Sequence, residues 1–212
     1  MTSRLAILID GEFFRRDIES RRNGPAEARD IIRHVRWITD HLVSIGISAP
    51  LYRVFYYTAD PPFGNKINPM NQTDTPLTDP SVGGKTKQLH RDLEREPYVA
   101  VRRGDVVFRG WRIKRGVARS LMEGKPRPLT ADDIRPNLKQ KGVDMRIGLD
   151  IASLALKRLV GHVVVVTADA DMVPALKLAR REGLQVYLDS LSSPGAKELR
   201  IHSDYVFPYN SH

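Results

Sequence analysis

RLAILIDGE (residues 4–12) places an unbroken apolar run directly before Asp10 and Gly11. A short apolar run that ends at a turn residue is typical of a strand buried on both faces, as in a parallel sheet. HVVVVTADAD (residues 162–171) repeats this arrangement, because four β-branched valines precede Asp169 and Asp171. Both segments therefore deliver acidic residues to the carboxyl end of a strand, where ligands bind in open α/β sheets. The two strands are candidates to be neighbours in that sheet.

A third acidic residue comes from KGVD (residues 141–144), which opens an amphipathic segment. Apolar residues recur at helical spacing from Ile147 to Leu159, so Asp144 falls in the first turn of a helix. Asp150 points about a third of a turn away from Asp144 on an ideal helix and is a weaker candidate.

Asp10, Asp144, Asp169 and Asp171 together predict a divalent-metal site. Carboxylates this close repel one another by several kcal/mol, so a cation must neutralise them or some must stay protonated. The chain has no cysteine, and its six histidines show no metal-ligand spacing, so the oxygen donors indicate Mg²⁺ or Mn²⁺. Each acid alone also has a structural interpretation, since Asp144 suits a first helical turn and Asp171 suits the N-cap of a helix over 172–182.

Composition bounds the class of protein. The chain has 212 residues, a formal net charge of +9 and a pI near 9.9. One domain over residues 1–212 is expected at this length, and the positive charge favours a polyanionic partner, although basic surfaces also occur without one. The absence of cysteine excludes disulfides and thiol catalysis. No apolar run is long enough for a membrane span and no signal-peptide pattern is visible, so a cytoplasmic protein with no membrane partner is expected.

The remaining segments predict an α/β fold with an insertion. Proline at the start and glycine at the stop favour a helix over 25–45, and a strand follows over 49–58, which implies a parallel crossover. The proline-rich segment at about 60–84 is expected to be an inserted loop or lid. A helix is expected over 85–96, followed by a basic segment over about 98–141 that begins with a β-hairpin or the next strand of the sheet.

This basic segment is where contact with a substrate is expected. Its cationic residues are interleaved with aromatic ones, a composition suited to phosphate contacts and base stacking. The residues are Arg102, Arg103, Arg109, Arg112, Lys114 and Arg115, with Phe108 and Trp111. An exposed strand face with a core tryptophan would give the same pattern.

Other basic residues flank the acidic motifs. Residues 125–141 are expected to form a linker that brings Lys139 and Lys141 towards the acids. Arg15 and Arg16 follow the first strand, where they would meet a phosphate or solvate a helix.

IDGE (9–12), KGVD (141–144) and TADADMVPAL (167–176) resemble the NYN domain of the LabA-like (DUF88) group, which is similar in fold to PIN-domain nucleases. The resemblance implies a Rossmann-like, PIN-like open parallel sheet flanked by helices. It also implies that Asp10, Asp144, Asp169 and Asp171 are the catalytic, metal-binding acids of a ribonuclease-type site, with Thr167 the hydroxyl residue before the paired acids. The chain departs from the family pattern at Phe13, where many relatives carry Asn.

These expectations combine into a metal-dependent ribonuclease that hydrolyses RNA phosphodiester bonds. Arg15, Arg16, Arg109, Trp111, Lys141 and Thr167 are its predicted substrate-binding residues. Two alternatives stay open: an RNA-binding or regulatory protein that does not cut, favoured by Phe13, and another Mg²⁺-dependent phosphoesterase. Glu12 counts against the second, because an aspartyl nucleophile site would carry Asp there. Oligomeric state is left open, with a homo-oligomer as one alternative.

Overall fold

Seven strands form one sheet in the computed structural model of the chain, which describes residues 3–22, 24–195 and 197–208. Their order across the sheet is β6-β5-β2-β1-β7-β8-β9, and every neighbouring pair is parallel except β5 and β6. The strands are β1 (Leu5–Asp10), β2 (Leu51–Ala59), β5 (Val99–Ile113), β6 (Ile134–Lys141), β7 (His162–Val166), β8 (Gln185–Asp189) and β9 (Tyr205–Val206). A separate antiparallel ribbon consists of β3 (Asn65–Ile67) and β4 (Asp74–Pro76).

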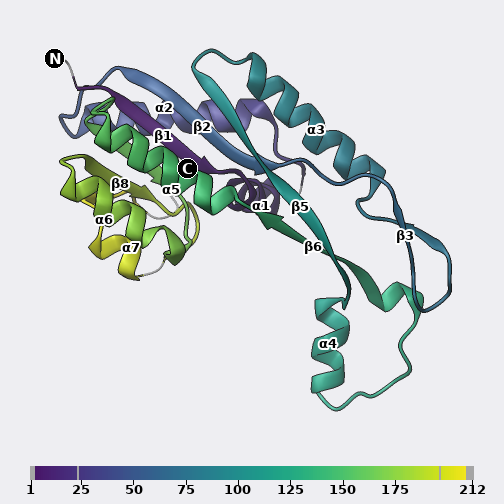
Figure 1. Cartoon of the computed structure of the whole chain (residues 1–212). Coiled ribbons are helices and arrows are strands. Elements are labelled where there is room, and N and C mark those ends of the chain that lie inside the picture. Colours follow the sequence, from purple (N-terminus) through teal and green to yellow (C-terminus); the bar gives the residue numbers. More distant parts are fainter. Residues whose placement is uncertain (1–2, 23, 196, 209–212) are drawn as a thin grey trace.

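Helices cover both faces of the sheet (Figure 1). They are α1 (Gly11–Arg22), α2 (Ala28–Ser44), α3 (Pro80–Arg95), α4 (Arg115–Met122), α5 (Val143–Leu156), α6 (Val173–Arg181) and α7 (Lys197–Ile201), with short 3₁₀ turns η1 (Ala131–Asp133) and η2 (Ala170–Met172). Alternate residues of β1 enter two separate cores, Ile7 with α1, α2 and α3, and Leu8 with α5, α6 and α7. Both residues are fully buried, as expected for a central strand covered on both faces.

The strand order reverses at β1, which has β2 on one side and β7 on the other. Ile9 lies opposite Tyr56 in β2 and opposite Val166 in β7. The crevice beyond the carboxyl ends of β1 and β7 is therefore the topological switch point, where α/β sheets bind ligands. The prediction that these two strands are neighbours is confirmed.

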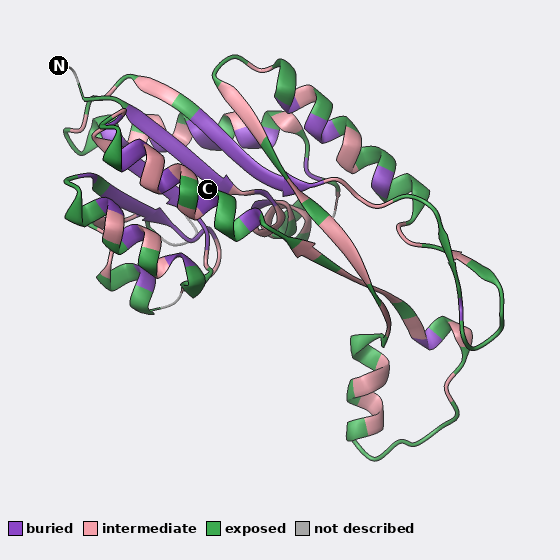
Figure 2. Ribbon diagram, viewed as in Figure 1, coloured by how far each residue is buried: buried purple, intermediate pink, exposed green. Residues whose placement is uncertain are grey.

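Residues 105–141, which we call the arm, project beyond this edge of the sheet (Figure 1). The arm contains the outer part of β5, α4, η1 and β6, and it is mostly exposed or half-buried (Figure 2). Its base packs closely, because a Cβ on Gly104 would lie 2.6 Å from the carbonyl oxygen of Lys141. The β3–β4 ribbon joins the arm through the side-chain amide of Asn68, which donates to the carbonyl of Ala131 at 3.3 Å.

The middle of the chain is more ordered than the sequence predicts. The segment expected to be a loop over 60–84 contains the β3–β4 ribbon and the first turn of α3, which Asp79 caps by accepting from the N–H of Ser81 at 2.8 Å. Of the two alternatives expected for residues 98–114, a hairpin or the next strand of the sheet, the second is confirmed, because β5 is one strand that pairs in parallel with β2. The prediction of a linker over 125–141 is wrong for its second half, because residues 134–141 form β6, which pairs with β5.

Candidate active site

Asp10 is the last residue of β1 and also caps α1. Its Oδ1 accepts hydrogen bonds from the backbone N–H groups of Glu12 and Phe13, both at 3.1 Å. Burial raises the pKa of the carboxyl to about 6 against the opposing effect of these N–H groups, and the negative charge of Asp144 adds to the rise. The site therefore holds a carboxylate whose ionisation is costly unless a cation is nearby.

Gly11 lets helix α1 begin directly against the sheet. A Cβ at this position would lie 2.5 Å from the carbonyl oxygen of Tyr57 and 2.6 Å from the ring of Tyr56. The Tyr56 hydroxyl also donates to the Gly11 carbonyl at 3.2 Å. The Asp-Gly pair of the first motif thus has a packing reason, since only glycine lets the helix start close enough for Asp10 to cap it.

Asp144 reaches the same crevice from the first turn of α5. Gly142 precedes the helix with φ +76°, a left-handed conformation that favours glycine, and lets β6 turn directly into α5. Partial burial raises the pKa of Asp144, and the negative charges of Asp169 and Asp171 raise it further. Asp144 therefore interacts electrostatically with the acids of both neighbouring strands.

Asp169 and Asp171 follow β7 in a tight hydrogen-bonded turn. The N–H of Asp169 donates to Thr167 Oγ1 at 3.1 Å, and Asp169 Oδ1 accepts from the N–H of Asp171 at 2.9 Å. Both acids are exposed, whereas Thr167 is 1% exposed. This burial favours a role for Thr167 in positioning Asp169 rather than in contacting a substrate.

The four acids suit a hard divalent cation by their chemistry. All offer carboxylate oxygens, and burial raises the pKa of Asp10 and Asp144, with repulsion between the acids adding to the rise. Within the described ranges, no group of three or more His, Asp or Glu side chains is close enough to enclose a metal ion. An open arrangement is compatible with Mg²⁺, which usually keeps several waters and takes only one or two carboxylates.

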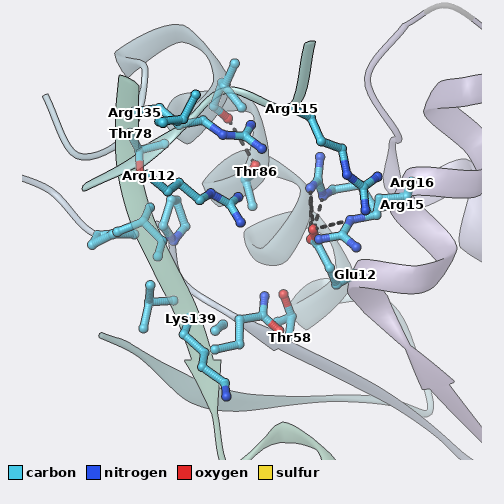
Figure 3. Close-up of a pocket in the computed structure, with 18 residues that line it drawn as sticks. Glu12, Arg15, Arg16, Thr58, Thr78, Thr86, Arg112, Arg115, Arg135 and Lys139 are labelled. Carbon is cyan, nitrogen blue, oxygen red and sulfur yellow. Dashed lines mark hydrogen bonds and ion pairs between the residues drawn. The ribbon is translucent and has the colours of Figure 1, made fainter. Parts of the chain in front are cut away.

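A basic cleft of about 850 Å³ lies between α1, α3 and the arm. None of the four acids lines it, but its lining includes Glu12, two residues after Asp10, and Thr58, which follows Tyr57, the β2 partner of Asp10. Figure 3 shows Arg112 and Arg135 extending from the arm towards the middle of the cleft, with Arg115, also from the arm, drawn on the side of Glu12, Arg15 and Arg16. Its cationic lining residues are Arg15, Arg16, Arg112, Arg115, Arg135 and Lys139. Glu12 is the one acidic side chain among the described residues that line the cleft.

The predicted substrate contacts are not all in this cleft. Arg15 and Arg16 line it, but both bind Glu12, at 2.8 and 2.7 Å. Lys141 is exposed at the end of β6, three residues before Asp144. Arg109 and Trp111 lie on the arm outside the lining, and Trp111 packs edge-on against Phe108 with ring centroids 6.1 Å apart.

Two features at the cleft were not predicted from the sequence. Arg135 was not singled out, because its segment was taken for a linker. A hydrogen-bond chain also begins at Thr58 in the cleft lining, where His90 contacts Thr58 Oγ1 at 2.9 Å and Asp60 Oδ1 at 2.8 Å. Thr58 lies in β2, Asp60 directly after it and His90 in α3, and they share no sequence motif, so only the fold brings them together.

Comparison with known proteins gives the family. The NYN domain matches residues 90–210, which include Asp144, Asp169 and Asp171. A crystal structure of VPA0982 from Vibrio parahaemolyticus RIMD 2210633, a protein of unknown function, superposes with a TM-score of 0.53 at 14% identity, covering 97% of this chain and 91% of that one. At this identity the likeness shows the fold alone. No curated protein matches the sequence significantly.

The fold and the match define a PIN-like α/β domain. The chain belongs to the NYN domain family. The matched region begins in α3, so β1 and Asp10 lie outside it. In the described part of the chain, no helix is both long and apolar enough to cross a membrane.

Proposed function

We propose that this protein is a metal-dependent ribonuclease that hydrolyses RNA phosphodiester bonds at Asp10, Asp144, Asp169 and Asp171. The observation that carries the proposal is the convergence of three chain segments, each ending in an acid, at the switch point of the sheet. The basic cleft beside these acids supports a polyanionic substrate.

The acids have different surroundings, and these suggest different tasks. Asp10 is half-buried and held by two backbone N–H groups, so it is a fixed anchor for a cation. Asp169 is held through Thr167 and through the N–H of Asp171. Asp144 lies in the first turn of α5, and its carboxylate would complete the metal site together with Asp10 and Asp169.

Bound Mg²⁺ or Mn²⁺ would lower the pKa of an attacking water and neutralise charge on the phosphoryl oxygens. The carboxylates of this chain would hold the cation and accept hydrogen bonds from the water. No nucleophilic side chain is needed for such a hydrolysis, which fits a crevice lined by acids.

The test is cleavage of labelled RNAs of mixed structure by purified protein with Mg²⁺ or Mn²⁺, with EDTA as a control. Asp169→Asn should lose activity while keeping its fold, because an asparagine oxygen can still accept from the N–H of Asp171. Asp40→Asn on α2 is the matched control, since it removes one exposed carboxylate far along the sequence from the site. Equal activity of all three proteins would overturn the assignment.

A second candidate, RNA binding without cleavage, is favoured by one feature. Phe13, which stands where many relatives carry Asn, is half-buried and packs against the core on the α2 side of the sheet. No polar side chain is supplied from that position. Salt-sensitive RNA binding with no cleavage in fresh Mn²⁺ would support this alternative.

A further inference from the structure

The arm carries a concentration of positive charge that internal ion pairs do not explain. Arg112, Arg115 and Arg135 come from β5, α4 and β6 and line the cleft (Figure 3). None of the three forms an ion pair with a carboxylate in the described ranges of the chain, and all three are exposed. Guanidinium groups that converge without counter-charges repel one another, so this arrangement is stabilised when an anion occupies the cleft.

The arginines on the opposite wall differ in this respect. Arg15 is bound by Glu12 and also by Glu19 at 2.7 Å, and Arg16 is bound by Glu12. Their charges are largely balanced within α1. The strongest uncompensated positive potential in the cleft therefore comes from the arm.

The dimensions and lining of the cleft limit what the anion can be. A volume of about 850 Å³ is near the upper end of the ~300–1,000 Å³ typical of ligand sites. This volume corresponds to a few nucleotides of one strand. Apolar surface comes from Pro61, Pro62, Ile113 and Leu138, and no aromatic ring is among the described lining residues. Because the described lining offers cationic side chains and no ring for base stacking, affinity would come mainly from phosphates.

We propose that the cleft between α1 and the arm is a strand-binding site that holds the phosphate backbone of single-stranded nucleic acid through Arg112, Arg115 and Arg135. The cleft lies next to Asp10, so a strand bound in it would extend towards the acidic residues. This inference rests on the proposed function for its substrate and adds where the strand is held, by which residues, and that it must be unpaired there.

The test is binding of a fluorescein-labelled oligouridylate, measured by fluorescence anisotropy in EDTA over a range of salt concentrations. The variant replaces Arg112, Arg115 and Arg135 with Gln. The control replaces Arg36, Arg95 and Arg181 with Gln, which removes the same charge from exposed positions on α2, α3 and α6. Thermal denaturation checks that both proteins are folded.

The expected result follows from counterion release. The slope of log K against log salt is negative, and each lost phosphate contact to a single strand makes it shallower by about 0.7. The slope of the arm variant should therefore be shallower than that of the wild type by about 2. Across a fourfold rise in salt the affinity of the arm variant would then fall by a factor about 16 times smaller than that of the wild type. The control should keep the wild-type slope, and an oligoadenylate–oligouridylate duplex should bind the wild type more weakly than the single strand.

Three outcomes would overturn the inference: equal slopes for arm variant and control, tighter binding of the duplex, or displacement of the strand by pyrophosphate at micromolar concentration. The last would identify a site for small polyphosphates. Equal slopes together with metal-dependent cleavage by the wild type would refute this inference alone. A weaker salt dependence of binding in the arm variant, together with no cleavage by the wild type, would refute the proposed ribonuclease and still support the strand-binding site.

Discussion

Replacing Asp10 with Asn should make the metal-free protein more stable at pH 8. Burial raises the pKa of this carboxyl from 3.8 to about 6, so keeping it ionised in the folded state has a cost. Asparagine has nearly the same shape, and its oxygen can still accept from the N–H groups of Glu12 and Phe13. The variant therefore removes the charge and keeps the helix cap.

The magnitude follows from linkage between protonation and folding. A shift of about 2 pKa units corresponds to about 3 kcal/mol between the protonation states, at ~1.4 kcal/mol per unit. Since the pKa is higher in the folded state, the folded protein binds the proton more tightly and stability falls as pH rises from about 4 to about 6. The variant should gain up to ~3 kcal/mol relative to wild type at pH 8 and little near pH 4.

Urea denaturation in EDTA at several pH values measures this difference. Added Mn²⁺ should narrow or reverse it, because the cation stabilises only a folded protein that binds it. A variant that is less stable than the wild type in EDTA at pH 8, or a difference that does not change with pH, would refute the reasoning.

Two further substitutions test the surroundings of the site by urea denaturation. His90→Leu should destabilise by about 1–3 kcal/mol, because His90 is 1% exposed and its loss leaves the buried Thr58 hydroxyl without its partner; full stability of this variant would show that the hydrogen-bond chain contributes nothing. Gly11→Ala should cost roughly 1–3 kcal/mol and reduce activity, because its Cβ would lie 2.5 Å from the Tyr57 carbonyl oxygen. Gly84→Ala in α3 is its control, since a Cβ there has nothing within 4 Å and should be neutral or stabilising by up to ~1 kcal/mol; equal effects of the two would contradict the packing argument.

The sheet core could be predicted from sequence because its signals are local. The valine run of β7 and the apolar run of β1 favour buried strands, and Asp10 ends β1 while Asp169 follows β7 by three residues. The amphipathic pattern after Gly142 likewise located α5 and placed Asp144 in its first turn. Parallel strands then bring these ends to one edge.

The arm could not be predicted in the same way. β6 (Ile134–Lys141) contains a proline and alternates weakly in polarity, and it becomes a strand because β5 offers it a long antiparallel partner. Such pairing is a tertiary effect that local propensity does not record. The cleft could not be predicted for the same reason, because Arg135 and the Thr58–His90 contact belong to it only when segments distant in the sequence come together.

The most direct test of the central claim is a calorimetric titration with Mn²⁺ of the wild type, Asp144→Asn and the control Asp40→Asn. Asp144 interacts with acids from both neighbouring strands, so its loss should weaken Mn²⁺ binding more than any other exposed substitution. The account predicts saturable binding by the wild type and the control, and binding at least tenfold weaker by Asp144→Asn, as is typical when a group that supports a metal site is removed. Identical isotherms for the three proteins would contradict it.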